Sequence, residues 1–138
     1  ALATAVRKAD EVIPFYCFDP RQFTMTSYGF PKTGAFRAQF LVESVENLAV
    51  QIRQRGGKLL VAVGHPEEVI PRLATEHRAD AVYAHKEVTD EETRVEDALE
   101  TQLWKQRIPV DFFWGHTLYH ADDLPFPIKN LPEVFTDF

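Results

Sequence analysis

The sequence predicts an α/β domain built on a doubly wound parallel sheet. Short apolar runs of strand length alternate with amphipathic helical segments along all 138 residues. The runs are continuously apolar, which is typical of parallel strands covered by helices on both faces. Hydrophobic residues make up 45% of the chain and aromatic residues 12%, enough for one folded core.

The first half of the chain predicts two helices, a strand and a long loop. Residues 2–9 predict a helix with Leu2, Val6 and Ala9 on one face. Residues 12–18 predict a strand, although Pro14 removes one ladder donor. Residues 19–34 carry the turn residues of a loop. Residues 35–55 predict a helix that Gly56 and Gly57 end, with an apolar stripe of Leu41, Val45, Leu48 and Ile52.

The second half repeats the alternation of strand and helix. Residues 58–64, 80–85 and 110–115 predict strands, and residues 65–77 and 90–107 predict helices. Pro66 suits a first helical turn, whereas Pro71 is expected to kink the helix or to delay its start. Val95, Leu99 and Leu103 share one side of the later helix. The tail from residue 116 is rich in proline and aromatic residues and is expected to be irregular.

Charge and cysteine content narrow the class of protein. The net charge is -6 and the isoelectric point about 5.3, so the chain alone is expected to bind nucleic acid poorly. Cys17, the single cysteine, lies in an apolar run and is expected to fill the core of a protein from a reducing compartment. No apolar run approaches the ~20 residues that span a bilayer. The first residues resemble a helix already under way, so we expect further residues before Ala1.

Ligands of open α/β sheets bind outside the carboxyl ends of the strands. The corresponding loops are residues 19–34, 64–66, 85–92 and those after 115. The dinucleotide and phosphate-loop motifs GxGxxG and GxxxxGK[ST] and the nucleophile-elbow motif GxSxG are absent. The turn at residues 64–66 is either an anion cradle or a plain strand-to-helix turn. His116 and His120 have i, i+4 spacing but lie in the irregular tail, so no zinc site is predicted. The residues alone indicate no catalytic set.

Several stretches resemble the N-terminal α/β domain of the photolyase/cryptochrome family, cryptochrome DASH branch. They are "FYCFDPRQF", "FPKTGAFRAQFLVESVENL", "GKLLVAVGHPEEVIPRLA", "VYAHKEVTDEE" and "WGHTLYHADDLPF", and their order and spacing carry the resemblance. The resemblance implies a Rossmann-like, five-stranded parallel sheet over residues 1–138, with the first strand missing from this chain. It also implies that the helical FAD-binding domain is absent, so Trp104 and Trp114 are not the family's electron-transfer tryptophans.

The resemblance further implies a function for the longer protein. It would be a blue-light flavoprotein similar to photolyases, which repair cyclobutane pyrimidine dimers, chiefly in single-stranded DNA, or act in photoreception. This domain would help to bind the antenna pigment, 5,10-methenyltetrahydrofolate, which passes energy to FAD. Its partner would be its own C-terminal domain, through which DNA would bind, and no membrane is involved. The protein would be intracellular, cytoplasmic if bacterial and organellar if from a plant or alga. Energy transfer requires a fixed distance and orientation rather than an acid, a base or a nucleophile.

The same resemblance selects candidate residues for the antenna folate. Glu87 matches the acid that contacts the pigment, and one carboxylate can accept two N–H groups of a pterin edge. Arg37 and Phe36, beside the loop that holds Lys32, are expected to face the same cleft, with Phe36 against the ring. A structural ion pair for Arg37 and a place in the helix core for Phe36 stay open. Asp90 and Glu91 are weaker candidates, since the acids of residues 90–97 also suit a solvated helix start.

Two other functions compete with the antenna domain. A stand-alone nucleotide-binding domain of the universal stress protein type requires a glycine-rich phosphate loop late in the chain, where this sequence has "LYHADDLPFP". A plain interaction module would expose the aromatic tail, and the isolated chain would self-associate.

Overall fold

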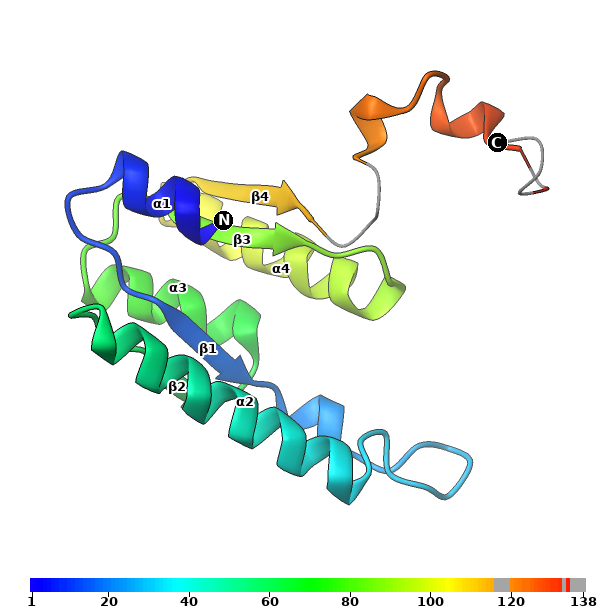
Figure 1. Cartoon of the computed structure of the whole chain (residues 1–138), viewed down its shortest axis with the longest axis horizontal. Helices are drawn as coiled ribbons and strands as arrows, with labels where there is room; N and C mark the ends of the chain where they lie inside the picture. Colours follow the sequence, from blue (N-terminus) through cyan, green and yellow to red (C-terminus); the bar gives the residue numbers. More distant parts are fainter. Residues whose placement is uncertain (116–119, 133, 135–138) are drawn as a thin grey trace.

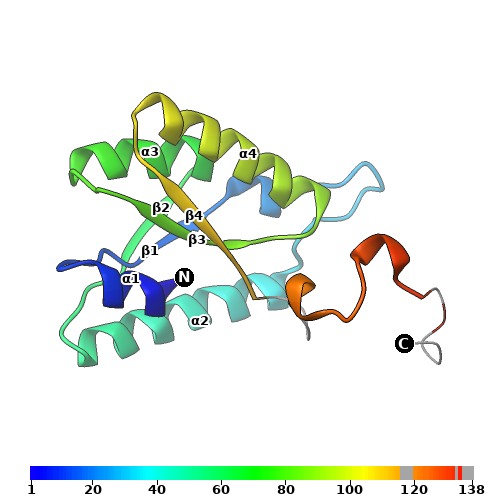
Figure 2. The same cartoon turned by 90° about the horizontal axis from the view of Figure 1, so that it is seen from above.

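The computed structural model describes residues 1–115, 120–132 and 134, and its elements form three layers. The strands occupy the middle layer, with α1 and α2 on one side of it and α3 and α4 on the other (Figure 2). This arrangement confirms the predicted α/β class with helices on both faces of parallel strands. The helices are α1 (Leu2–Lys8), α2 (Ala35–Gln54), α3 (Pro66–Glu76) and α4 (Asp90–Lys105). The strands are β1 (Phe15–Phe18), β2 (Leu60–Val63), β3 (Val82–Lys86) and β4 (Val110–Trp114).

The four strands form two separate parallel pairs. β1 pairs with β2 from Phe15↔Leu60 to Phe18↔Val63, and β3 pairs with β4 from Val82↔Val110 to Lys86↔Trp114. No ladder joins the two pairs within the described residues. β1 and β3 are the strands that face each other across the middle layer, and all the carboxyl ends point to the same side of the molecule (Figure 1).

The core lies on the side of the sheet that α3 and α4 cover. Its buried members are Ala74, Leu99 and Leu103, and Leu103 has no exposed surface at all. Around them pack the half-buried side chains of Ile70, Ala79, Val82, Ile108 and Val110. Leu99 and Leu103 lie one turn apart on α4, so the predicted apolar side of this helix is confirmed for both.

The apolar faces predicted for α1 and α2 are only partly right. In α1, Leu2 and Val6 are 49% and 62% exposed, while Ala5 is buried. This seven-residue helix lies against β3, with the ammonium of Lys8 5.9 Å from the ring centroid of Tyr83. So short an apolar pattern does not fix which face turns inward. In α2, Val45 is buried as predicted but Leu48 is 41% exposed.

Pro14 determines where β1 begins, whereas Pro71 does not determine where α3 begins. β1 begins at Phe15 rather than at residue 12, because Pro14 has no N–H to donate to a ladder. The carbonyl of Pro14 accepts the N–H of Leu60 at 2.8 Å. α3 begins at Pro66, so the expected delay by Pro71 is wrong. The carbonyl of His65 accepts the N–H groups of Glu68 and Val69, which starts the helix one turn before Pro71.

Gly56 ends α2 as predicted, in the left-handed region with φ of 83°. Its N–H donates to the carbonyl of Arg53 and that of Gly57 to the carbonyl of Ile52, the pattern of a Schellman cap. A Cβ at Gly56 would meet nothing within 4 Å, so a substitution there changes backbone strain alone.

Gly56→Ala is therefore expected to lower the free energy of unfolding by about 1 kcal/mol, measured by urea denaturation. Gly34→Ala is the matched control, because Gly34 also has open space around its Cβ position but a φ of −72°. Equal unfolding midpoints for the two variants would contradict the strain argument.

Candidate functional site

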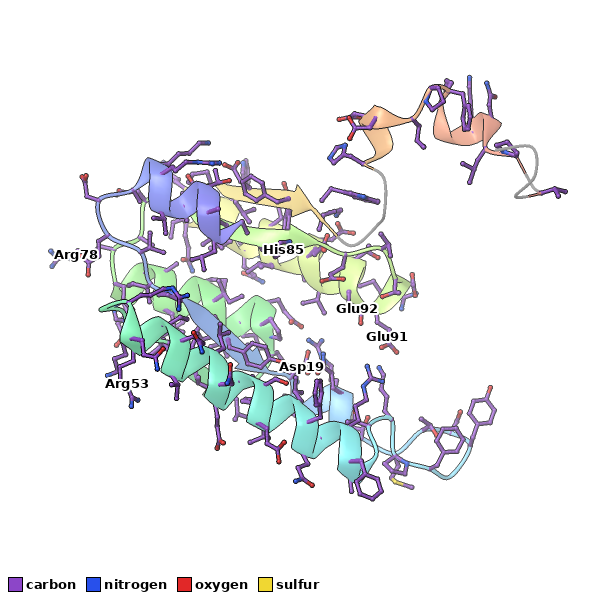
Figure 3. The ribbon with its side chains drawn as sticks, viewed as in Figure 1. Asp19, Arg53, Arg78, His85, Glu91 and Glu92 are labelled. Carbon is purple, nitrogen blue, oxygen red and sulfur yellow. The ribbon has the colours of Figure 1, made fainter. Side chains whose placement is uncertain are left out.

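The carboxyl ends of the strands bring the long loop of residues 19–34 and the loop between β3 and α4 to one edge. Asp19, Glu91 and Glu92 lie toward this edge, whereas Arg53 and Arg78 lie toward the opposite one (Figure 3). The edge is the one at which the sequence predicts a ligand.

Glu87 follows directly after the last residue of β3 and is half-buried. Its backbone N–H donates to Oε1 of Glu96 at 2.5 Å. The other carboxylate oxygen of Glu96 accepts a hydrogen bond from the ammonium of Lys86, and this bond raises the pKa of Lys86 above its ordinary value. The start of the loop is thus fixed from α4, and with it the point from which the Glu87 side chain leaves the backbone.

Lys32 joins the long loop to the beginning of α4. Its ammonium forms an ion pair with the carboxylate of Glu91, four residues after Glu87. Its backbone N–H donates to the carbonyl of Thr24 at 2.9 Å, and a bridge between Met25 and Pro31 closes the hairpin within the same loop. The structure therefore brings Lys32 and the loop of Glu87 to the same edge of the sheet, as the prediction requires.

The other three predicted residues are placed differently from one another. Phe36 and Arg37 lie in the first turn of α2, and Phe36 is 90% exposed, so it is not part of the helix core. Arg37 is also exposed and forms no ion pair with any residue that the structure describes. Asp90 pairs with Arg94 of its own helix at 2.8 Å, with both side chains about three-quarters exposed. That contact suits a solvated helix start better than a ligand site.

Sequence reasoning missed a charged cluster between β1 and α3. The guanidinium of Arg21 contacts the carboxylate of Asp19 at 2.6 Å and that of Glu67 at 2.8 Å. Burial alone would raise the pKa of both carboxyls, but the hydrogen bonds from Arg21 outweigh it and hold each pKa below its ordinary value. Asp19 is buried, so the cluster closes the end of β1 against the first turn of α3. Asp19 and Arg21 stand in "FDPRQF", but no sequence spacing links them to Glu67.

The turn at residues 64–66 is part of the same region. The N–H of Gly64 donates to the carbonyl of Phe18 at 3.0 Å, and the carbonyl of Gly64 accepts the thiol of Cys17 at 3.3 Å. A Cβ at Gly64 would lie 2.7 Å from Cγ2 of Val69, so the strand and the helix approach too closely for a larger residue. With Glu67 at the helix start, these contacts favour the plain strand-to-helix turn over an anion cradle. Burial raises the pKa of Cys17, in keeping with a core thiol.

Glu96 is a further residue that the sequence analysis passed over, as one of several acids at a helix start. It is 6% exposed and shares its side of α4 with Leu99 and Leu103, at spacings i, i+3 and i+7. An acid within an apolar stripe is the signal that distinguishes it from its neighbours, because a buried carboxylate needs a partner.

Other kinds of site find no support in the described part of the chain. No group of three or more histidine, cysteine or acidic residues there is arranged to hold a metal ion, and His116 lies outside the described residues. None of its helices has the length and apolarity of a membrane span. A hollow of about 570 Å³ lies between α3 and α4, but polar and charged side chains including Glu67, Arg72 and Gln102 line it.

The chain is a three-layer α/β domain in which Glu96 holds the loop between β3 and α4 at the carboxyl ends of the strands. Comparisons with known proteins show to which family this domain belongs. The whole chain, residues 1–138, matches the DNA photolyase family. It is 54% identical over 137 residues to cryptochrome DASH of Gloeobacter violaceus, covering 99% of this chain and 27% of that protein. It is 52% identical over 127 residues to a blue-light photoreceptor of Arabidopsis thaliana, covering 92% of this chain and 28% of that protein.

Solved structures agree with these relatives. The Synechocystis cryptochrome superposes with a TM-score of 0.96 at 47% identity, over 99% of this chain and 28% of that one. An archaeal photolyase of Sulfolobus tokodaii, at 24% identity and a TM-score of 0.77, covers 89% of this chain and 27% of that one and shares the fold. The chain therefore belongs to the photolyase/cryptochrome family and represents the N-terminal α/β domain of its cryptochrome DASH branch.

Family membership confirms the Rossmann-like fold and gives the universal stress protein alternative no support. It implies chromophores of the flavin and folate types in general. The chain spans about a quarter of the length of the relatives it matches, which are full-length photolyases and cryptochromes. The relatives from Solanum lycopersicum and Arabidopsis thaliana named cryptochrome DASH are described as chloroplastic/mitochondrial.

Proposed function

We propose that this domain helps to hold a 5,10-methenyltetrahydrofolate antenna in a longer, FAD-containing blue-light flavoprotein. The observation that carries the proposal is the position of Glu87 at the carboxyl end of β3, with its backbone N–H held by Glu96. A carboxylate in this place can accept two N–H groups from the edge of a pterin ring. In the longer protein the folate would pass its excitation to FAD, for dimer repair in single-stranded DNA or for photoreception.

The remaining candidates fit other parts of a folate. Arg37 lies at the same edge as a cation, and the glutamate tail of a folate carries carboxylates that such a group attracts. Lys32 lies at this edge too, but its ammonium already pairs with Glu91. Phe36, with 90% of its side chain exposed, offers an aromatic face to a ring that a second domain would enclose. Asp90 contributes least, because Arg94 already neutralises it.

The partner proposed for this edge is the C-terminal FAD-binding domain of the same protein, through which DNA would also bind. Large apolar side chains are exposed in the first turns of α2 and in the hairpin, namely Phe36, Phe40, Tyr28 and Phe30. Exposed aromatic side chains gathered in this way indicate a surface that another domain covers. The expected compartment, cytoplasmic in a bacterium and organellar in a plant or alga, remains a prediction.

We also propose that a fifth parallel strand, outside this sequence, lies between β1 and β3. Among the described residues, neither strand has a ladder partner on that edge, and their partners β2 and β4 are on the outer sides. A strand inserted at this position would unite the two pairs into one five-stranded sheet and remove the two inner edges.

The function is tested in the full-length protein by Glu87→Gln. Glutamine keeps the size of the side chain but removes the charge that strengthens both hydrogen bonds to the pterin. We expect purified protein to lose its folate absorption band and to keep its flavin bands. Titration with excess folate should give a dissociation constant about a hundredfold higher.

Glu76→Gln is the matched control, because Glu76 is exposed in the last turn of α3 and should leave both chromophores unchanged. Unchanged folate affinity in Glu87→Gln would remove Glu87 from the site. A wild-type protein that binds flavin but no added folate would overturn the antenna function itself.

A further inference from the structure

Glu96 and Asp19 are the buried charged residues of the described chain, and the effect of Glu96 on folate binding has not yet been considered. Its carboxylate lies beside Leu99 and Leu103 on the side of α4 that packs against the sheet. A charge in such surroundings destabilises the fold unless partners compensate for its lost hydration. The groups that contact the Glu96 carboxylate therefore indicate its structural role.

Both partners of Glu96 stand at the end of β3. Oε1 accepts the backbone N–H of Glu87 at 2.5 Å, and Oε2 accepts the ammonium of Lys86. The ladder between β3 and β4 ends at Lys86↔Trp114, so the N–H of Glu87 is the first that lies beyond the strand. Glu96 supplies the acceptor that a neighbouring strand would otherwise provide.

The geometry limits the freedom of Glu87 from both ends of its loop. Residues 87–89 are the whole connection between β3 and α4. On the strand side the carboxylate of Glu96 fixes the backbone of Glu87, and on the helix side the hydroxyl of Thr89 donates to Glu92. The Lys86 side chain is itself confined, with its ammonium 5.2 Å from the ring centroid of Phe112. A buried carboxylate tied to two confined groups holds a loop more rigidly than an exposed ion pair does.

We propose that Glu96 is a positioning residue for the folate site, which sets the place and direction of Glu87 before the ligand binds. This proposal rests on the proposed function of Glu87 and goes beyond it. Glu96 does not touch the folate. It keeps Glu87 in the binding geometry, so that the ligand does not have to order the loop.

The test uses the full-length protein with Glu96→Gln and, as matched control, Glu100→Gln. Glu100 lies one turn later on α4 and is exposed. Glutamine at position 96 loses the charge that holds Lys86 and weakens the bond to the N–H of Glu87. We expect a dissociation constant for 5,10-methenyltetrahydrofolate on the order of tenfold higher, with flavin occupancy unchanged. Hydrogen exchange of the Glu87 amide should be faster in Glu96→Gln and unchanged in Glu100→Gln.

A double-mutant cycle separates positioning from a merely structural role. If Glu96 acts through Glu87, adding Glu96→Gln to Glu87→Gln should change the folate affinity by less than twofold, because the group to be positioned has already lost its charge. Two independent, multiplying losses would overturn the positioning role. So would wild-type folate affinity in Glu96→Gln beside a clear loss in Glu87→Gln. If Glu87→Gln keeps the wild-type folate affinity, Glu87 is not part of the folate site and the positioning role of Glu96 fails with it, whereas the antenna function is tested separately by folate binding to the wild-type protein.

Glu96→Asp provides a second variant should Glu96→Gln fold poorly. Aspartate keeps the charge near Lys86 but is one methylene shorter, which lengthens the bond to the Glu87 N–H. The folate affinity should again fall on the order of tenfold. An aspartate variant with wild-type affinity would show that the bond to the Glu87 backbone does not matter for binding.

Discussion

Replacing Leu103 with alanine is expected to lower the free energy of unfolding by about 3 kcal/mol. The Leu103 side chain is fully buried, and Ala74, Leu99, Ile108 and Val110 belong to the core around it. Truncation removes apolar contacts from α4 to both α3 and the strands and leaves a cavity that these elements close only in part. Urea denaturation followed by circular dichroism measures the change.

Trp104→Ala is the control for Leu103→Ala. Trp104 is the next residue of the same helix, but its side chain is 79% exposed. Its truncation removes a larger group from the surface and should change the free energy of unfolding by about 0.5 kcal/mol or less. A Trp104 variant as destabilised as the Leu103 variant would contradict the assignment of the core to the inner face of α4.

Replacing Arg21 with methionine is expected to cost about 2 kcal/mol at neutral pH. Asp19, which is buried, and Glu67 would then face each other without the guanidinium that neutralises both. We place the cost below that of a fully buried pair because the Arg21 side chain is 42% exposed and water screens it in part. Arg53→Met, on the last turn of α2, is the control.

The pH dependence distinguishes this cluster from a packing effect. In the native protein the pKa of each carboxyl, Asp19 and Glu67, is below its ordinary value. Their contribution is present above the unfolded pKa, near pH 4, and is lost as the pH falls through the lower folded pKa. Without Arg21, burial and mutual repulsion raise both, so stability should increase as the pH falls from 7 toward 5. Parallel pH curves for the variant and the native protein would refute the ion cluster.

The elements of this fold could be predicted because each carries a local signal. The stripe of Leu99 and Leu103 and the two glycines after α2 each act over a few residues of chain. The face of α1 was not predictable, since seven residues supply too few apolar positions to select Ala5 over Val6. The site divides in the same way. The place of Glu87 follows from a strand end, but the pair of Lys32 and Glu91 joins residues 59 apart in sequence.

The contacts of Glu67 and Glu96 show why the remaining parts of the site could not be predicted from the sequence. Both are acids near a helix start, where the sequence offers several equivalent carboxylates. Only the packing of α3 and α4 decides that one meets Arg21 from another loop and the other meets the end of β3. The sequence periodicity indicates that Glu96 faces inward, but it does not indicate which groups Glu96 contacts.

The division of the sheet into two pairs has a consequence for how the domain unfolds. In the part of the chain that the structure describes, the pair of β1 and β2 shares no ladder with the pair of β3 and β4, and the packing of α3 on α4 links them. Each pair can therefore lose structure without breaking a backbone hydrogen bond of the other. A central strand would add bonds to both pairs at once and make their melting a single all-or-none event. The strand between β1 and β3 would thus supply cooperativity as well as hydrogen bonds.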